Sequence, residues 1–339
     1  MSKMHMLASY PGEKEVKSAE VVSMKSVSFE ALRPSHFEEL TDLMHNAFGN
    51  LVSPDYFEWK YVRNPLGPAV GNIAREDSSG EIIAFYGLIP QLYRFGGQEQ
   101  LLYQSCDTMT HSNFRRRGLF QRLAERTFKE QLSINDGFFA IGFGGSNSAP
   151  GFFKMGWKQI FELSHSLKPR FLSRLGNCSS EAKEYSSISP EIAARFEQRH
   201  KNAQDGIVID GAYLKWKWSN PRKNYNFVSV GTSTCVYHVK EDLVYIDHVM
   251  GEDRDSLREI GRKIDQIVNS LPVRGVTSFA QKGRSMERTL KDWGFFTNPF
   301  NRGPGSRRLP FIAYAKPGSE TRLMTCAAWD ISPLDHDNF

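Results

Sequence analysis

The chain has 339 residues, which is more than one typical domain needs and fits two of ordinary size. Hydrophobic residues make up 40% and charged residues 24%, which are ordinary values for a soluble globular protein. The net charge of +5 suits an anionic ligand. It is far weaker than the basic stripe of a dedicated nucleic-acid binder, so we expect no nucleic-acid partner.

Several classes of protein are disfavoured before any motif is considered. No apolar run approaches the roughly 20 residues that a membrane helix needs, so we expect no membrane span. Residues 1–25 contain Pro11-Gly12 and alternating charges without an apolar stretch, which predicts a flexible N-terminal segment rather than a secretory signal. The cysteines show no metal-ligand spacing, so we expect reduced thiols in a cytoplasmic protein and no metal site: Cys106, Cys178, Cys235 and Cys326.

A short element occurs twice in the chain. The segment 56–60 reads YFEWK and is followed by Asn64-Pro65, and it returns at 213–217 as YLKWK, followed by Asn220-Pro221. Each copy follows a predicted amphipathic helix. The first helix has Ser35 and Glu38 in capping-box spacing. The second has Ser189 as its cap and Pro190 at its first position, and it extends to His200.

The segments that follow also agree between the copies. After the first copy we expect strands at 81–90, 91–95 and 101–111, with a Gly96-Gly97 hairpin turn, then a helix from Leu119 to Leu132 and a buried strand at 138–143. After the second copy we expect strands at 227–230, 234–239 and 243–250, a helix from Leu257 to Leu271 and a strand at 275–280. Each copy closes on glycine and an aromatic residue, at Gly156-Trp157 and Gly294-Phe295.

One constant offset aligns Leu119 with Leu257 and Gly156 with Gly294, which is hard to attribute to chance. We therefore predict an N-terminal domain at 26–170, a linker at 171–189, a second domain at 190–316 and a C-terminal tail at 317–339. Acidic residues and a histidine in the tail could reach a site, although such residues are more often solvated: Asp330, Asp335, His336 and Asp337.

The turn Arg115-Arg116-Arg117-Gly118-Leu119-Phe120 lies where a predicted strand ends and a helix begins. The first turn of a helix has N–H groups without internal partners, and its dipole favours an anion. Gly118 would let the backbone approach a phosphate, and the arginines would add charge-assisted contacts. The alternative is a solvated basic turn; the position at a helix start favours phosphate.

This turn resembles the acyl-CoA pyrophosphate loop of the GNAT N-acetyltransferases, Gln/Arg-x-x-Gly-x-Gly/Ala. Arg115 and Gly118 match that pattern, while Phe120 stands where Gly or Ala is usual. A later family motif resembles Asn147 followed by Phe152-Phe153-Lys154-Met155-Gly156-Trp157. The resemblance implies an α/β (α+β) fold with two tandem GNAT-like domains, each a mixed, mostly antiparallel sheet flanked by helices.

The second copy departs from the motif. The offset places Asp253-Arg254-Asp255 at the three arginines, Ser256 at Gly118 and Ser285 at Asn147. Carboxylates there would repel a pyrophosphate. We therefore predict a degenerate second domain that has lost the CoA site and shapes an acceptor pocket.

The resemblance implies direct attack of an acceptor amine on the thioester of acetyl-CoA or another acyl-CoA. It implies that Thr108, Met109 and Thr110 line the pantetheine and acetyl group, and that Asn147 contacts the cofactor or separates two strands. It also implies a pyrophosphate held by Arg115, Arg116, Arg117, Gly118, Leu119 and Phe120. Phe152 borders the cofactor where the family often has a tyrosine acid, so the thiolate would take its proton from water, Tyr86 or Tyr103.

Asp107 and His111 are the candidate bases, because they lie on the strand that enters the site. Each has a plainer alternative, since Asp107 could simply hydrogen-bond at the strand end and His111 could be a surface residue. Strand alternation puts both with Met109 on one face. Lys60 recurs as Lys217, which favours a structural role for that lysine, and Trp59 and Trp216 are predicted to lie in the core.

The sequence therefore predicts an acyl-CoA-dependent N-acetyltransferase acting on a small primary amine. The Trp-Lys-x-x-x-Asn-Pro element resembles one in GNAT proteins of bacterial surface-polysaccharide synthesis, which suggests an amino sugar; other small amines or antibiotics stay open. One alternative is a non-catalytic acyl-CoA-binding or regulatory module. A transferase fed by aminoacyl-tRNA is disfavoured by the mild charge. The sequence leaves the oligomeric state open.

Overall fold

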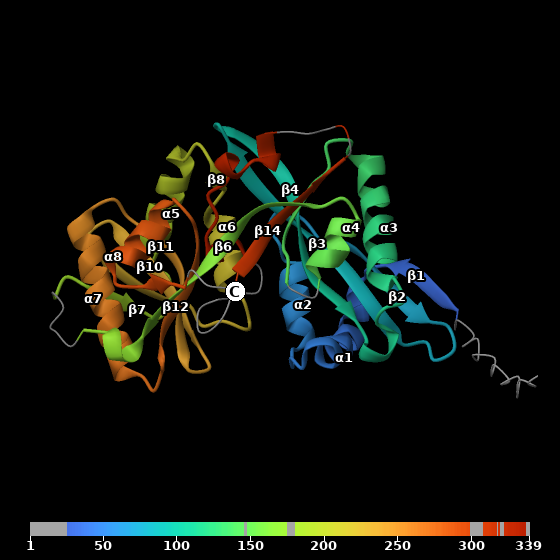
Figure 1. The fold of residues 1–339 in the computed structure, drawn as a ribbon, viewed down its shortest axis with the longest axis horizontal. Helices are drawn as coiled ribbons and strands as arrows, with labels where there is room; N and C mark the ends of the chain where they lie inside the picture. Colours follow the sequence, from blue (N-terminus) through green and yellow to red (C-terminus); the bar gives the residue numbers. More distant parts are fainter. Residues whose placement is uncertain are drawn as a thin grey trace, which may run out of the picture.

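The computed structural model describes residues 26–145, 148–174, 180–298, 308–316, 318 and 322–336. Its strands form one 14-stranded mixed sheet in the order β1-β2-β3-β4-β5-β14-β6-β12-β11-β10-β9-β7, with β13 on β6 and β8 on β3. Helices cover the sheet in two lobes, as Figure 1 shows. Within these residues, no helix is long and apolar enough to cross a membrane. No group of three or more His, Cys, Asp or Glu there could hold a metal ion.

The N-terminal lobe follows the predicted order closely. Its strands are β1 (Val27–Ala31), β2 (Val70–Glu76), β3 (Ile82–Phe95), β4 (Gln98–Thr110), β5 (Phe139–Phe143) and β6 (Lys158–Pro169). Its helices are α1 (Phe37–Phe48), α2 (Pro54–Tyr61), α3 (Leu119–Ile134) and α4 (Ala149–Lys154). The Gly96-Gly97 hairpin turn is confirmed, with positive φ at both glycines. The capping box at Ser35 was wrong, because a 3-10 turn over Pro34–His36 precedes α1 and His36 is the N-cap.

The second lobe repeats this order. Its strands are β7 (Lys183–Tyr185), β8 (Gly206–Ile207), β9 (Asn226–Val230), β10 (Ser233–Lys240), β11 (Leu243–Met250), β12 (Gly275–Gln281), β13 (Phe296–Thr297) and β14 (Arg308–Ala315). Its helices are α5 (Pro190–Asn202), α6 (Gly211–Trp218), α7 (Arg254–Ser270) and α8 (Ser285–Asp292). Ser189 caps α5 as predicted, since its hydroxyl accepts the N–H of Ile192 at 3.2 Å.

The two lobes share strands. β14 lies near the C-terminal end of the sequence, yet it pairs antiparallel with β5 on one side and β6 on the other. β6 in turn pairs with β12 of the second lobe, over Pro169 to Leu163. In Figure 1, β6 and β14 lie between the lobes. The sheet is therefore continuous, and neither lobe completes its own sheet alone.

The repeated Trp-Lys elements contact each other across the lobes. The Trp59 and Trp216 rings stack with centroids 5.2 Å apart, and both side chains are buried. The Trp59 Nε1–H donates to the Trp216 carbonyl at 2.7 Å, and the Trp216 Nε1–H donates to the Trp59 carbonyl at 2.8 Å. These reciprocal bonds satisfy both indole donors inside a core that spans the two lobes.

The C-terminal segment packs against this core. Trp329 is 1% exposed, and the buried Asp335 carboxylate accepts hydrogen bonds from Tyr93 Oη at 3.0 Å and from the Ser332 backbone N–H at 2.8 Å. Burial raises the pKa of Asp335 to about 6, against the opposing effect of these bonds. The expectation of solvated tail residues was wrong for Asp335, while Asp337 lies outside the described residues.

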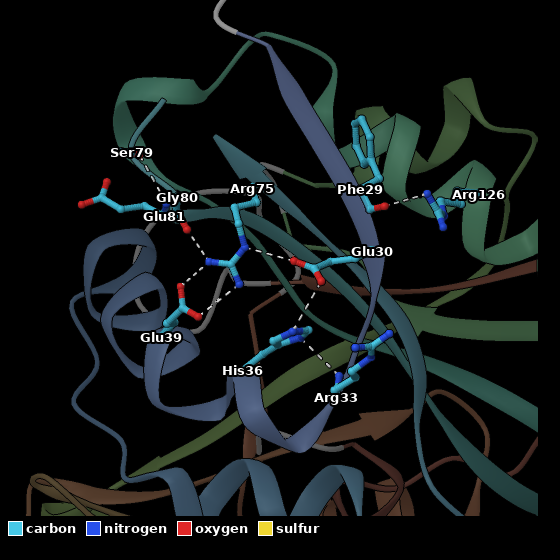
Figure 2. A network of polar contacts seen from close by, with 10 residues as sticks. All are labelled: Phe29, Glu30, Arg33, His36, Glu39, Arg75, Ser79, Gly80, Glu81 and Arg126. Atoms are coloured by element: carbon cyan, nitrogen blue, oxygen red, sulfur yellow. Dashed lines mark hydrogen bonds and ion pairs between the residues drawn. The ribbon is translucent and has the colours of Figure 1, made fainter. Parts of the chain in front are cut away.

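A polar cluster fixes α1 against β1 and β2 (Figure 2). The Arg75 guanidinium donates to Glu30 at 3.0 Å and to both Glu39 carboxylate oxygens, at 2.6 and 3.1 Å. His36 Nε2 lies 3.8 Å from Glu30 on its other side. The Arg75 hydrogen bond, with further help from His36, lowers the pKa of Glu30. The cluster therefore places α1, whose C-terminal end borders the cleft described next.

Candidate functional site

A cleft of about 1550 Å³ opens between the lobes. The N-terminal lobe lines it with the ends of α1 and β4, the start of α3, and α4. The second lobe contributes Asn220, Arg222, Lys223 and residues 238–240, and the C-terminal part adds Arg308 and His336. The cleft thus joins the predicted phosphate turn to a wall built from the second copy of the repeat.

Strand β4 presents a backbone edge to this cleft. It pairs parallel with β5 at Tyr103, Gln104 and Ser105. Beyond Ser105, the paired residues of β4 have β3 as their only partner among the described strands. The β3 register shifts next to Asp107, whose φ of 44° marks a bulge. A strand edge that diverges from its neighbour in this way can pair with an extended ligand that carries amides.

The start of α3 lies at the same end of the cleft. Gly118 is its N-cap, with φ 72° and ψ 8°, and no described side chain caps the helix. A Cβ added at Gly118 would have nothing within 4 Å, so the space above this residue is open. The uncapped N–H groups and the helix dipole make this turn a suitable place for an anion. Gly118, Leu119 and Phe120 all line the cleft.

The three arginines of the turn have different surroundings. Arg115 lines the cleft, but its guanidinium donates to the Ala47 carbonyl at 2.9 Å and so ties the turn to α1. Arg116 lines the cleft with φ 63°, and its side chain has no hydrogen-bond or ion-pair partner within the described residues. Arg117 lies outside the cleft lining, 4.7 Å from the Phe114 ring, and donates to the Asn113 carbonyl. Arg116 is therefore the arginine placed to meet a ligand.

Phe120, where the family pattern has a small residue, is accommodated by a glycine. A Cβ on Gly151 of α4 would lie 2.5 Å from Phe120 Cε1, so the absence of a side chain there makes room for the ring. Phe120 also packs edge-on against Phe152, with centroids 4.9 Å apart. Phe152 is buried, borders the cleft and contacts Trp157. The departure from the pattern therefore leaves the turn intact.

Asp107 is the centre of a buried polar cluster. Its Oδ2 accepts from Lys60 Nζ at 2.7 Å and from Tyr61 Oη at 2.8 Å, with Tyr56 Oη at 3.4 Å. The Lys60 side chain is fully buried. Burial, followed by the Asp107 charge, raises the pKa of Tyr61 well above its ordinary value, so the phenol stays a donor. The predicted structural role of Lys60 thus includes neutralising a carboxylate that borders the cleft.

The other predicted site residues are divided by position. Thr108 and Thr110 line the cleft, whereas Met109 is buried in the core shared by the two lobes. His111 precedes the 3-10 turn Ser112–Phe114, and its Nδ1 accepts the Asn113 N–H at 3.3 Å. His111 is absent from the cleft lining among the described residues. Asn147 lies outside the described residues.

Neither tyrosine considered as a proton donor borders the cleft within the described part of the chain. Burial raises the pKa of Tyr86 well above its ordinary value, with a smaller opposing effect from Ser105. Burial also raises the pKa of Tyr103. Among the described residues, the phenol that lines the cleft is that of Tyr56. Its sequence context, YFEWK, indicates only the repeated element and gives no signal of a site.

The corresponding helix of the second lobe is capped by its own side chain. Asp253 is the N-cap of α7 and accepts the Ser256 backbone N–H at 2.9 Å. A carboxylate therefore occupies the end of α7 that is the counterpart of the open end of α3. The cleft forms at α3 and excludes the start of α7 among its described lining residues.

Comparisons with known proteins agree with this geometry. Residues 28–160 match the family model described as an acetyltransferase (GNAT) domain. A comparison with curated proteins found no match.

Solved structures resemble the chain over most of its length. A conserved protein of Enterococcus faecalis described as a probable N-acyltransferase has 12% identity and a TM-score of 0.63, with 85% of this chain and 72% of that chain covered. A GCN5-related N-acetyltransferase of Anabaena variabilis has 10% identity and a TM-score of 0.61, with the same coverage. One from Kribbella flavida has 12% identity and a TM-score of 0.56, with 85% and 70% covered. At these identities the resemblance shows that the chain shares their fold.

Proposed function

We propose that the chain is an acyl-CoA-dependent N-acyltransferase, with acetyl-CoA as its donor and a primary amine as its acceptor. The observation that carries this proposal is the uncapped start of α3 at Gly118, beside the diverging edge of β4. The helix end suits the pyrophosphate, and the strand edge suits the amides of pantetheine. The fit is supported by the open space above Gly118 and by Arg116, whose side chain has no hydrogen-bond or ion-pair partner in the described part of the chain.

The reaction that fits this site is direct transfer. The acceptor nitrogen attacks the thioester carbonyl carbon, the carbon–sulfur bond breaks, and the nitrogen keeps the acyl group. The proton that the nitrogen loses balances the one that the thiolate gains. The protein contributes orientation, and N–H groups at the diverging edge of β4 can stabilise charge on the carbonyl oxygen. Thr108 and Thr110 border the place where this would happen.

The buried contacts of Asp107 count against its predicted role as the base. Its carboxylate already accepts from a lysine ammonium and a phenol, and protonating it would leave the Lys60 charge buried without its partner. Asp107 suits a positioning role instead, because it holds the bulge of β4 against α2. Since the cleft lining excludes His111 in the described residues, the amine would have to enter neutral or lose its proton to solvent.

We further propose that the second lobe is a degenerate copy that serves the acceptor. The matching order of elements and the reciprocal Trp59–Trp216 bonds support duplication. The Asp253 cap supports loss of a phosphate site at α7. An amino sugar is the leading acceptor, because of the resemblance of the Trp-Lys element. A non-catalytic acyl-CoA-binding module is the second candidate, which Phe152 favours because it provides no proton donor.

Thiol release separates these two functions. Wild-type protein with acetyl-CoA should release CoA faster when primary amines such as glucosamine or nucleotide-linked amino sugars are added. Gly118→Glu should abolish this release, because a carboxylate would stand at the pyrophosphate position. Gly80→Glu is the matched control, since Gly80 has nearly the same φ of 74°, a Cβ there would meet nothing within 4 Å, and neither Gly80 nor its neighbours are among the described cleft-lining residues. CoA binding without amine-dependent release would favour the regulatory module.

A further inference from the structure

The cleft has a strongly positive lining. Its described lining residues include seven lysines and arginines and one carboxylate, Asp107, which Lys60 neutralises. Arg115, Arg116 and Lys154 belong to the N-terminal lobe. The other four form what we call the cation wall: Arg222, Lys223, Lys240 and Arg308. A charge imbalance of this size in a cleft attracts anions.

The first two cations of the wall lie on a turn that does not need them. Asn220 Oδ1 accepts the Arg222 N–H at 2.9 Å, just as Asn64 Oδ1 accepts the Leu66 N–H at 2.9 Å in the first copy. The two Asn-Pro turns therefore share a geometry. The first copy continues with Leu66-Gly67, whereas the second, which faces the cleft, continues with Arg222-Lys223. The charges of Arg222 and Lys223 are therefore not required to form the turn.

Arg222 lies close to the acyl end of the cofactor site. Its guanidinium carbon is 5.2 Å from the centroid of the Tyr56 ring. The Tyr56 hydroxyl is 3.4 Å from Asp107, which immediately precedes Thr108 on β4. Arg222 is itself exposed, so its guanidinium N–H groups can reach a ligand. A group held by Arg222 would be a near neighbour of the reacting amine.

The remainder of the wall is built on buried polar groups. Lys223, whose side chain is 8% exposed, has Nζ 3.9 Å from Asp247 Oδ1. The second Asp247 oxygen lies 2.6 Å from His238 Nδ1. His238 lines the cleft, is 1% exposed, and its Nε2 has no hydrogen-bond partner among the described residues. Lys240 lies two residues along β10 and is exposed. A buried imidazole nitrogen that borders the cleft and has no partner among the described residues indicates a ligand position.

From this arrangement we propose that the cation wall is an acceptor subsite for a phosphate-bearing group. The acceptor would be an amine linked to a phosphate or diphosphate, as in a nucleoside-diphosphate-linked amino sugar. The wall keeps a net positive charge although Asp247 lies 3.9 Å from Lys223, and this charge matches a diphosphate better than the single charge of a carboxylate. The inference rests on the proposed function, because it assigns the α3 end of the cleft to CoA and this wall to the second substrate.

The test is calorimetric titration of uridine diphosphate into protein saturated with CoA, so that the turn at α3 is occupied. We expect binding that weakens as NaCl is raised, and a loss of at least about tenfold in each of Arg222→Glu and Lys240→Glu. CoA affinity should stay unchanged in both variants. Lys282→Glu is the matched control, an exposed charge reversal on the second lobe away from the cleft lining.

The other possible results overturn either the phosphate subsite or the proposed function. Absence of uridine diphosphate binding to the CoA-loaded protein would overturn the subsite while leaving the proposed function. Loss of CoA affinity in the wall variants would assign the wall to the cofactor and also overturn the subsite. Equal binding of glutamate would overturn the preference for phosphate. If wild-type protein fails to bind CoA, the proposed function falls, and titration without CoA still shows whether the wall variants lose uridine diphosphate.

Discussion

Replacing Arg116 by Gln should weaken acetyl-CoA binding far more than replacing Arg117 by Gln, although the two residues are neighbours with the same charge. Arg116 lines the cleft and has no described partner in the protein, so its guanidinium is available to the pyrophosphate. Arg117 lies outside the lining and packs over Phe114. Comparing the two variants therefore separates the effect of the arginine's position on binding from the effect of net charge.

The expected magnitudes differ by one to two orders. Losing one hydrogen bond to a charged group costs about 1.5–3 kcal/mol, which is about 10- to 150-fold in affinity. A charge about 10 Å from the ligand across water contributes about 0.4 kcal/mol, or about twofold. At Arg116 the φ is 63°, and glutamine is strained there to about the same degree as arginine. The free energy of unfolding should therefore change little.

Isothermal titration of acetyl-CoA at one fixed salt concentration measures both variants, and thermal unfolding confirms that each is folded. The reasoning requires a large loss for Arg116→Gln and a small one for Arg117→Gln. Equal losses would mean that the turn acts through net charge alone. A larger loss for Arg117→Gln would place the phosphates outside the cleft and refute the assignment.

Three further predictions concern the stability of the fold. Gly151→Ala should destabilise the fold by about 1–3 kcal/mol, because the new Cβ would lie 2.5 Å from Phe120, and Phe120→Leu should restore most of the loss in a urea titration. Lys60→Met should cost about 3–5 kcal/mol, because it leaves the Asp107 charge buried, and the double variant with Asp107→Asn should be less damaged than the two changes summed. Burial, and then the charge of His200, lower the pKa of His248 to about 3. The unfolded chain, with a histidine pKa near 6.5, then binds the extra proton first as pH falls, so His248 makes stability decline below about pH 6.5 by about 1.4 kcal/mol per unit. His248→Gln should remove that share of the decline; urea midpoints at pH 7 and pH 5 that shift equally in both proteins would contradict it.

Local patterns predicted the elements that form the phosphate turn. The apolar stripe of α3, the glycine before it and the strand before that glycine are all encoded within about twenty residues, so periodicity and turn chemistry were sufficient. Ser189 was predicted as a cap for the same reason. Ser35 had the same kind of signal and was wrong, because a 3-10 turn delays the helix to Phe37.

Local patterns do not predict which strands and side chains meet when they are far apart in the sequence. The sequence of β14 indicates a strand, but nothing local says that it will lie between β5 and β6 of the other lobe. The contact of Lys60 with Asp107 joins residues 47 positions apart. Arg222 and Lys223 follow the second Asn-Pro pair, whereas Leu66 and Gly67 follow the first. The sequence alone does not indicate that these two charges border the same cleft as the start of α3.

Calorimetric titration of acetyl-CoA into wild-type protein and into Gly118→Glu tests the proposed cofactor site most directly. We expect saturable micromolar binding, one molecule per chain, to the wild type. We expect at least a hundredfold loss of affinity in the variant, since a carboxylate about 5 Å from the pyrophosphate costs about 3 kcal/mol at an effective dielectric constant of about 20. Equal affinity in the two proteins, or no binding to the wild type, would contradict the assignment of the α3 turn to acetyl-CoA.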